Sequence, residues 1–212
     1  MADSVAITLL RHGLTEANER KAYLGWTDSP LSIKGKRDIE EWKQYYPRYE
    51  RIHSSDLLRC METSRHLFPE VDPVGWPAFR EMNFGRWEGR TYEELKTNAD
   101  YQKWLEDPMV AAVPKGESYP DFSRRVHNGW ARLIADEDSS TYAVMTHGGV
   151  IRELLARYAP VEKPFWDWSI PHAKGYELIW ENKERLRRGE RCTLLQAVPI
   201  MGKLNGSSNF TG

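Results

Sequence analysis

Residues 5–13, VAITLLRHG, decide the fold of this chain. The run VAITLL is nearly continuous in apolar residues, which is typical of a strand buried on both faces of a parallel sheet. Residues 141–146 (TYAVMT) have the same character and are followed by His147-Gly148-Gly149. Because ligands bind beyond the carboxyl ends of parallel strands, we expect His12 and His147 to lie in one crevice.

Helices and strands are expected to alternate along the rest of the chain. Helices are predicted over residues 32–46 and 57–68, after Thr91, from Ser118 to about Asp136, and over residues 150–158. Brief strands are predicted over 51–54 and 71–76, and residues 176–180 and 192–198 are predicted to form an antiparallel edge hairpin across a charged turn at Arg188-Gly189. The first of these helices should turn four residues inward: Ile33, Ile39, Trp42 and Tyr46. This order predicts a three-layer α/β/α domain with a mostly parallel central sheet.

Length and composition narrow the class of protein. The chain has 212 residues, of which 40% are hydrophobic, and a net charge of −1. These values favour a single globular domain over residues 1–200 with a mobile tail over residues 201–212, and they give no reason to expect a nucleic-acid or membrane partner. Cys60 and Cys192 lie far apart in the sequence, so we expect two free thiols and a cytoplasmic location. The oligomeric state is not predicted.

The two histidine segments carry the chemistry. Glycine directly after each histidine lets the backbone turn sharply and approach a ligand closely. The second segment also opens a helix, whose first N–H groups favour an anion, and Arg11 adds a cation suited to phosphate. A lone histidine at a strand end is more often structural, but two at matching strand ends favour a phosphate site.

Further segments resemble one known family. Leu10–Asn18 (LRHGLTEAN) is similar to the signature of the histidine phosphatase superfamily, the phosphoglycerate mutase-like proteins. The family's later segments follow in order over about residues 5–160: 25–31 (GWTDSPL), 54–64 (SSDLLRCMETS), 80–89 (REMNFGRWEG), 116–126 (GESYPDFSRRV) and 147–149 (HGG). One departure is Lys115, where relatives often have glycine, and we expect it to affect local solubility or pocket charge.

The resemblance implies a role for each motif residue. His12 would be the nucleophile, its other ring nitrogen held by a backbone carbonyl, and Glu81 would be the acid and base. Arg11, Arg59 and His147 would surround the phosphoryl oxygens, while Asn18 and Gly148 would add contacts to the substrate. No metal and no cofactor are expected, because these groups supply the positive charge themselves.

Several assignments stay open at this point. Glu88 competes with Glu81 for the acid role, and His172 is a candidate for the pocket rim. Four aromatic residues near the motifs are candidates for an apolar leaving-group pocket: Trp26, Phe84, Trp87 and Tyr92. His53, His66 and His127 match no motif and are expected to be ordinary core or surface histidines.

Other mechanisms fit the sequence poorly. A Cys-based phosphatase needs Cys-x5-Arg, but Arg65 follows Cys60 after only four residues and His66 stands where arginine is required. A zinc hydrolase would need clustered ligands such as HExxH or paired CxxC motifs. A non-catalytic phosphate-binding module is a further alternative, yet a pure binder has no need of the carboxylate of Glu81 beside an anion.

The main rival within the family is a phosphoglycerate mutase. A mutase must shield its phosphorylated intermediate from water. Only 65 residues separate Glu81 from His147, which is short for a segment that covers the site, and the tail beyond residue 200 is polar. We therefore expect a phosphatase acting on small-molecule phosphate monoesters. The sequence does not separate a narrow enzyme, such as one for α-ribazole phosphate or phosphoserine, from a broad one.

Overall fold

A six-stranded sheet forms the centre of the protein. The computed structural model describes residues 4–199, so the tail predicted over 201–212 lies outside the described residues. The strand order is β3-β2-β4-β1-β5-β6. The bounds in this order are Val74–Gly75, Ile52–Ser54, Thr141–Thr146, Val5–Arg11, Gly175–Trp180 and Leu194–Val198. The predicted strands are all present.

Strand directions divide the sheet into two parts. The pairs β3–β2, β2–β4 and β4–β1 are parallel, whereas β1–β5 and β5–β6 are antiparallel. The predicted edge hairpin is therefore confirmed. Its connection is more than a turn, because α8 (Lys183–Arg187) begins where the Asn182 side chain accepts a hydrogen bond from the Arg185 N–H. This short helix was not predicted.

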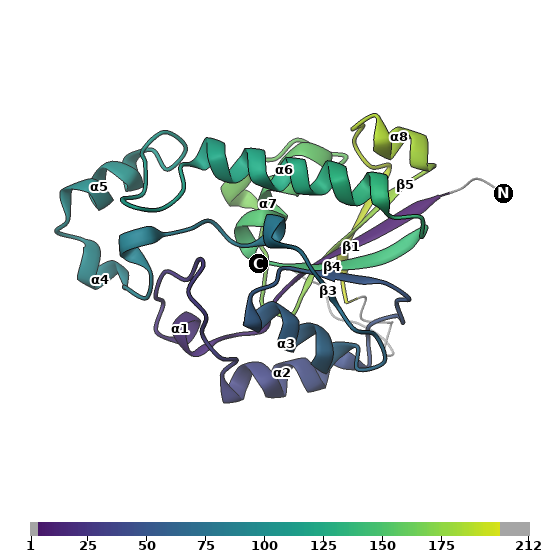
Figure 1. Ribbon diagram of the computed structural model, residues 1–212, viewed down its shortest axis with the longest axis horizontal. Helices are drawn as coiled ribbons and strands as arrows, with labels where there is room; N and C mark the ends of the chain where they lie inside the picture. The colour runs from purple at the N-terminus through teal and green to yellow at the C-terminus, as the bar shows by residue number, and fades with distance from the viewer. Residues whose placement is uncertain (1–3, 200–212) are drawn as a thin grey trace, which may run out of the picture.

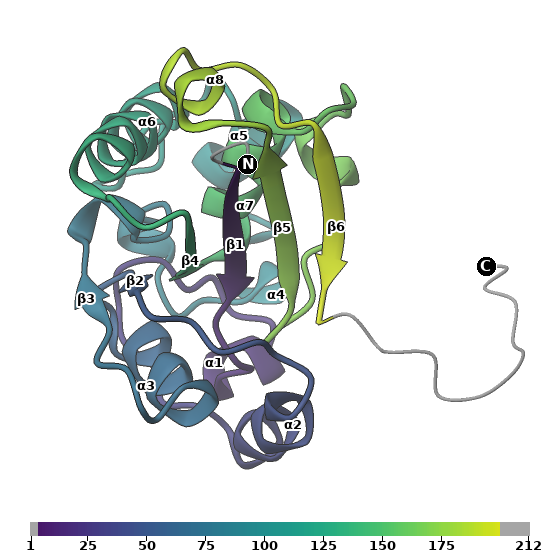
Figure 2. The same ribbon diagram turned by 90° about the vertical axis from the view of Figure 1, so that its right-hand side faces the viewer.

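Helices cover both faces of the sheet, as Figures 1 and 2 show. On one side lie α6 (Tyr119–Asp136), α7 (Gly148–Tyr158) and α8, and on the other lie α2 (Ile33–Lys43) and α3 (Leu58–Leu67). Side chains alternate between two cores, since Leu9 and Val144 pack with Trp130 of α6 while Leu10 and Met145 pack with Ile39 of α2. The three-layer α/β/α prediction is confirmed.

The inward face of α2 differs from the prediction at one residue. Ile39 is fully buried, but Ile33 is 91% exposed. The two residues are six positions apart, which separates their directions by about 120° around a helix. Ile33 therefore points to solvent. It is the first helical residue after the Ser32 cap.

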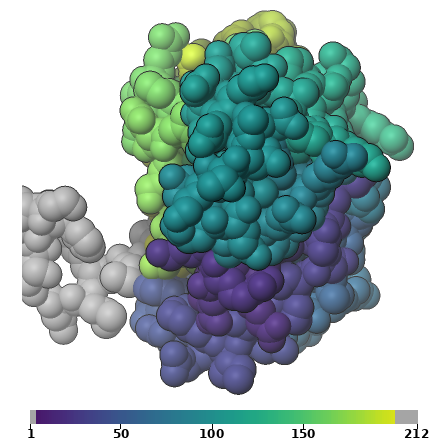
Figure 3. All heavy atoms as spheres, turned by 90° about the vertical axis from the view of Figure 1, so that its left-hand side faces the viewer, coloured from purple at the N-terminus to yellow at the C-terminus, as the bar shows by residue number. Residues whose placement is uncertain are grey.

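Short helices gather at the carboxyl edge of the sheet. In Figure 1 this edge faces α1 (Glu16–Glu19), α4 (Tyr92–Leu95) and α5 (Ala99–Glu106). Figure 3 looks onto this end of the molecule, where the purple segment that includes α1 meets the teal segment that includes α4 and α5. The Tyr23 N–H donates to the Arg90 carbonyl oxygen at 2.8 Å and so ties the two segments together. Neither α1 nor α5 was predicted.

Three single-turn 3₁₀ helices complete the described chain: η1 (Pro77–Phe79), η2 (Gly85–Trp87) and η3 (Phe165–Asp167). Across residues 4–199, no helix combines the length and the apolar character needed to cross a bilayer.

Candidate active site

His12 and His147 lie side by side because their strands do. β1 and β4 are parallel neighbours with Arg11 opposite Thr146, so the next residue of each chain segment leaves the sheet at the same edge. The two ring centroids are 5.1 Å apart. Both side chains are buried, with His12 4% exposed and His147 fully covered. The two histidines that were predicted to meet at the strand ends therefore lie in contact there.

The hydrogen bond of His12 fixes its tautomer. Nδ1 lies 2.7 Å from the carbonyl oxygen of Gly13. Because a carbonyl only accepts, Nδ1 carries the hydrogen and Nε2 keeps a free lone pair. Burial holds the pKa of His12 well below 6.5, and the nearby Arg59 and Arg11 lower it further. The imidazole is thus neutral and has one nucleophilic nitrogen.

His147 is held in the opposite tautomer. Its Nδ1 accepts a hydrogen bond from Nη2 of Arg59 at 3.2 Å, since a guanidinium only donates. Nε2 therefore carries the hydrogen and donates to the Ser55 hydroxyl at 2.9 Å. Burial, followed by Arg59 and His12, holds the pKa of His147 well below 6.5. Ser55 follows β2 directly and belongs to the 54–64 segment, for which the sequence predicts only the role of Arg59.

Arg59 and Arg11 each leave one buried donor without a protein partner. Arg59 is fully buried, and its two terminal nitrogens donate to the carbonyl oxygens of Gly25 at 2.6 Å and Thr27 at 3.0 Å. Arg11 donates from Nη1 to Ile170 O at 2.7 Å, and burial lowers its pKa to about 10. Within the described chain, Nε of both arginines is buried with no acceptor. Such donors are costly when unpaired, so their presence indicates an anion site.

Glu88 serves the loop that holds Arg59. Its carboxylate accepts hydrogen bonds from four backbone N–H groups at 2.9–3.2 Å: those of Gly25, Trp26, Thr27 and Phe84. Two of these residues supply the carbonyl oxygens that bind the Arg59 guanidinium. The carboxylate of Glu88 is therefore occupied with positioning a phosphate-site arginine.

Glu81 contacts the start of α7, directly after His147. Its Oε2 accepts the N–H of Gly149 at 3.0 Å, and its Oε1 accepts the N–H of Met82 at 3.0 Å. Gly149 is the second residue after His147, so the carboxylate lies against the start of α7. Of the two candidate acids, Glu81 is the one whose carboxylate contacts the segment that follows His147.

The first residues of α7 are enclosed by charged side chains. A Cβ on Gly149 would lie 2.2 Å from Oε1 of Glu81. A Cβ on Gly148 would lie 3.3 Å from Nη1 of Arg152 and 3.6 Å from Cζ of Arg11. Arg152 was missed by the sequence reasoning, although it is four positions after Gly148 and so on the same helix face.

His172 and Asn18 lie at the rim. The ring centroids of His172 and His12 are 5.6 Å apart, and Nε2 of His172 lies 3.1 Å from Oδ1 of Asn18. Burial, with a smaller contribution from Arg11, lowers the pKa of His172 to about 3. Oδ1 of Asn18 also accepts from the N–H and hydroxyl of Thr15, so its amino group is the part that can face a ligand.

The four aromatic residues predicted for the pocket lie in different environments. Trp26 donates from Nε1 to the carbonyl oxygen of Glu81 at 2.9 Å, and Phe84 lines a cavity next to that residue. Trp87 is only 2% exposed and packs against Trp104 in the core, so its assignment to the pocket is wrong. Tyr92 is 53% exposed on α4 and does not line the cavity. The η2 turn buries Trp87 while Phe84 stays at the surface of the site.

The other histidines and the acidic side chains form no metal centre in the described part of the chain. His53 is buried and pairs with Glu137 at 2.7 Å, His127 lies 3.0 Å from Glu153, and His66 is on the surface of α3. Within residues 4–199, no group of three or more His, Cys, Asp and Glu side chains is placed to hold a metal ion.

Comparison with known proteins identifies the family. An adenosylcobalamin/alpha-ribazole phosphatase from Salmonella typhimurium is 34% identical over 157 residues, which cover 70% of this chain and 77% of the relative. A 2,3-bisphosphoglycerate-dependent phosphoglycerate mutase from Bartonella henselae is 26% identical over 167 residues, covering 70% of this chain and 79% of the mutase.

Solved structures agree with these relatives. The alpha-ribazole phosphatase from Shigella flexneri superposes with a TM-score of 0.78 and 26% sequence identity, over 84% of this chain and 92% of that one. The family model described as histidine phosphatase superfamily (branch 1) matches residues 7–188. The chain therefore belongs to the histidine phosphatase superfamily.

Proposed function

We propose that this protein is a phosphatase that hydrolyses small-molecule phosphate monoesters through a phosphohistidine on His12. The observation that carries the proposal is the state of His12. Its Nδ1–H is engaged with the Gly13 carbonyl oxygen, its Nε2 is free, and its pKa is lowered by burial and two arginines. A neutral, fixed imidazole beside unpaired arginine donors is what attack on a phosphoryl group requires.

The first step makes the phosphohistidine. Nε2 of His12 attacks phosphorus, the ester P–O bond breaks, and Glu81 gives its proton to the leaving oxygen. The buried Nε donors of Arg11 and Arg59 bind the phosphoryl oxygens during this step. In the second step Glu81 takes a proton from water, the water oxygen attacks phosphorus, and the P–N bond breaks.

We infer that neither step needs a metal ion. Arg11, Arg59 and the first N–H groups of α7 supply the positive potential that a cation would otherwise provide. Activity should then survive exhaustive treatment with EDTA, and orthovanadate should inhibit. A chelated enzyme that regains activity only with zinc or magnesium would contradict this part of the proposal.

Phosphoglycerate mutase is the alternative that the relatives raise, because a mutase is among them. Hydrolysis is favoured because the segment between Glu81 and His147 is short for one that shields a phosphorylated intermediate from water. A panel of phosphomonoesters, with α-ribazole phosphate first because two relatives carry that name, separates the activities when run beside a mutase assay on both phosphoglycerates.

The decisive experiment traps the intermediate. Protein quenched during turnover should carry an alkali-stable, acid-labile phosphate that maps to His12. His12→Ala should lose many orders of magnitude in kcat, whereas losing a single binding contact costs about 10²–10³-fold. Tungstate binding to His12→Ala should weaken far less than turnover, because Arg11 and Arg59 remain.

The matched control is His66→Ala, which removes a histidine on the surface of α3. A label on His147 would reverse the two histidine roles. No label, together with substantial turnover by His12→Ala, would exclude the covalent mechanism. Tungstate binding without any turnover of any ester would favour a binding module.

A further inference from the structure

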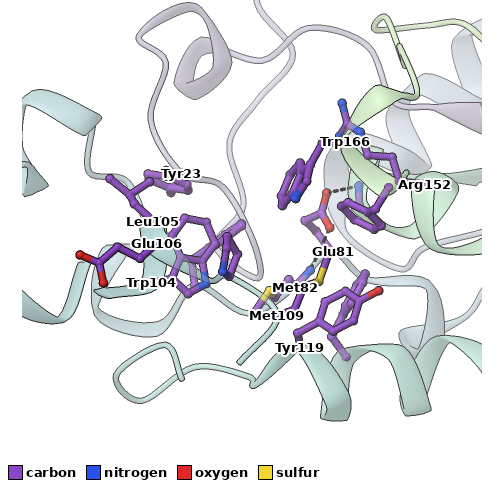
Figure 4. Close-up of a pocket in the computed structure, with 15 residues that line it drawn as sticks. Tyr23, Glu81, Met82, Trp104, Leu105, Glu106, Met109, Tyr119, Arg152 and Trp166 are labelled. Atoms are coloured by element: carbon purple, nitrogen blue, oxygen red, sulfur yellow. Dashed lines mark hydrogen bonds between the residues drawn. The ribbon is translucent and has the colours of Figure 1, made fainter. Parts of the chain in front are cut away.

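A cavity of about 570 Å³ opens beside Glu81. Glu81, Gly149 and Arg152 form one end of it, which is the end that adjoins the phosphate site. The rest of the wall is mainly aromatic and thioether side chains, drawn in Figure 4. These side chains include Tyr23, Trp104, Met109, Tyr119 and Trp166. The volume is within the range of pockets that hold small organic ligands.

One wall of the cavity is rigid. Trp104 of α5 is 6% exposed, and its ring packs edge-on against Tyr23 and Trp87 with centroids 5.8 Å and 5.5 Å away. Tyr119, on the side of the cavity next to η3, is also fixed, because its ring packs against Phe165 and its hydroxyl donates to the buried carboxylate of Glu153 at 2.5 Å. These rings form an apolar surface before any ligand arrives.

The opposite wall is exposed. Trp166 of η3 is 56% exposed, although it is one of the largest apolar side chains of the protein. Figure 4 places its ring across the open space from Trp104, on the same side as Glu81. A ligand that entered this space would cover Trp166 and bury its ring.

Charge is unevenly distributed along the cavity. Arg152 lies at the phosphate end, where its Nε donates to the Trp168 carbonyl oxygen at 3.1 Å. Glu106, the last residue of α5, is exposed at the far end, and Figure 4 shows its carboxylate pointing away from the open space. Among the described lining residues no lysine, arginine or histidine lies at that far end. A carboxylate or second phosphate on the far part of a ligand would therefore find no cation there among the described lining residues.

We propose that this cavity binds the leaving group, and that the substrates are phosphate monoesters of alcohols that carry an aromatic ring and no acidic group at the far end. The inference rests on the proposed function, since it places the phosphoryl group at His12. The ring would sit between Trp104 and Trp166, and the ester oxygen would lie next to Glu81. Aromatic rings stack favourably on such walls.

Three esters of primary alcohols test the proposal: benzyl phosphate, 4-carboxybenzyl phosphate and ethyl phosphate. Burial of the ring should raise kcat/KM for benzyl phosphate about 10–100-fold above ethyl phosphate. The added carboxylate should remove most of this advantage. Equal values for benzyl and ethyl phosphate would overturn the proposal, as would a preference for the carboxylated ester.

A matched pair of variants locates the effect. Met109→Glu puts a carboxylate into the cavity, and it should lower the benzyl-to-ethyl ratio of kcat/KM about tenfold. Val110→Glu adds the same charge at the next residue, which is 77% exposed and does not line the cavity. It should leave the ratio unchanged. A ratio that falls equally in both variants, or in neither, would contradict a leaving-group site here.

Binding separates this inference from the proposed function. Benzylphosphonate and methylphosphonate are not hydrolysed, so calorimetry reports affinity alone. Benzylphosphonate should bind about tenfold or more tightly, and Met109→Glu should remove the difference. If that holds while no ester is turned over and no phosphohistidine forms, the cavity stands and the phosphatase proposal fails. Equal affinities with a normal phosphohistidine would overturn the cavity alone.

Discussion

The phosphate end and the leaving-group cavity of this site are built in contrasting ways. At the phosphate end the side chains of His12, Arg59 and His147 are almost completely buried and are held by specific hydrogen bonds. In the cavity, Trp166 is more than half exposed and Leu105 is 44% exposed, and most contacts are apolar.

The difference follows from what each part must do. Phosphoryl transfer requires atoms fixed to within a fraction of an ångström, so its groups need directional bonds from several elements. Apolar contacts are less directional, and an apolar wall accepts ligands of related shape. We therefore expect changes at the phosphate end to abolish chemistry, and changes in the cavity to alter substrate choice.

Glu81 lies on the border between the two ends, so its replacement should give the largest effect in this comparison. Glu81→Gln keeps the size of the side chain but removes the proton that the leaving oxygen needs. Alkyl phosphates should lose about 10²–10⁴-fold in kcat, whereas p-nitrophenyl phosphate, with a better leaving group, should lose much less.

Glu88→Gln is the matched control for this prediction. Its carboxylate accepts only backbone N–H groups, so the substitution should impair alkyl and p-nitrophenyl phosphates to the same degree. A leaving-group dependence in Glu88→Gln, and none in Glu81→Gln, would exchange the roles of the two carboxylates.

The same contrast explains how much could be predicted from sequence. His12 and His147 directly follow β1 and β4, and Arg11 is the last residue of β1, so the parallel strand pair alone brings them together. Trp104 and Trp166 come from α5 and η3, two short elements that lie far apart in the sequence. Their approach depends on tertiary packing, which a local pattern does not encode.

Individual errors have the same origin. Trp87 lies five residues after Met82 and was assigned to the pocket by proximity in sequence, but the η2 turn directs it into the core. Arg152 was missed because no motif marks it, although its spacing from Gly148 on a helix was available as a signal. The mutual position of His12 and His147 could be predicted because each directly follows a strand of the parallel part of the sheet.

Gly149 should be the next most sensitive position. A Cβ there would lie 2.2 Å from Oε1 of Glu81, the end of a flexible side chain, so the protein should fold with the carboxylate displaced. Gly149→Ala should lower kcat/KM for alkyl phosphates about 100-fold and reproduce the leaving-group dependence of Glu81→Gln. Circular dichroism and orthovanadate affinity should stay close to those of the parent protein.

Gly148→Ala provides the comparison at the neighbouring residue. Its Cβ would meet Nη1 of Arg152 at 3.3 Å, which needs a movement of only a few tenths of an ångström. We expect a loss under about tenfold, with no leaving-group dependence. Equal losses in the two variants would mean that the helix start, and not Glu81, is what the methyl group disturbs.

The neutral histidines should make folding stability depend on pH. The pKa values of His12, His53, His147 and His172 are all lowered, mainly by burial. Above the unfolded value of about 6.5 these groups are neutral in both states, and their full contribution to stability is present. As pH falls below it, the unfolded chain binds protons that the folded protein does not, so stability is lost at up to about 1.4 kcal/mol per pH unit for each group.

Urea unfolding between pH 7.5 and pH 5 measures this slope. His172→Gln removes a rim histidine and should flatten the slope by up to the contribution of one group. His66→Gln is the control at a histidine whose side chain is 43% exposed. A slope that is the same in the parent protein and in His172→Gln would contradict a neutral, buried His172.

The smallest expected effect is at Lys115, which belongs to neither end of the site. It was expected to alter local solubility or pocket charge, but it is exposed, does not line the cavity and has a φ of 58°. This left-handed conformation costs a residue with a Cβ about 1–2 kcal/mol, whereas glycine adopts it freely but loses about 0.5–1 kcal/mol more in chain entropy. Lys115→Gly should therefore raise the free energy of unfolding by about 0.5 kcal/mol.

The control for Lys115→Gly is Lys103→Gly, because Lys103 is an exposed residue in the middle of α5. Glycine within a helix should lower the free energy of unfolding by about 1 kcal/mol, so the same substitution should have opposite signs at the two lysines. Both values come from urea unfolding at one pH. A loss of stability in Lys115→Gly would mean that the side chain makes contacts worth more than the strain it imposes. If Lys115→Gly is more stable and its benzyl-to-ethyl ratio of kcat/KM is unchanged, then Lys115 affects the backbone conformation of its loop and neither end of the site.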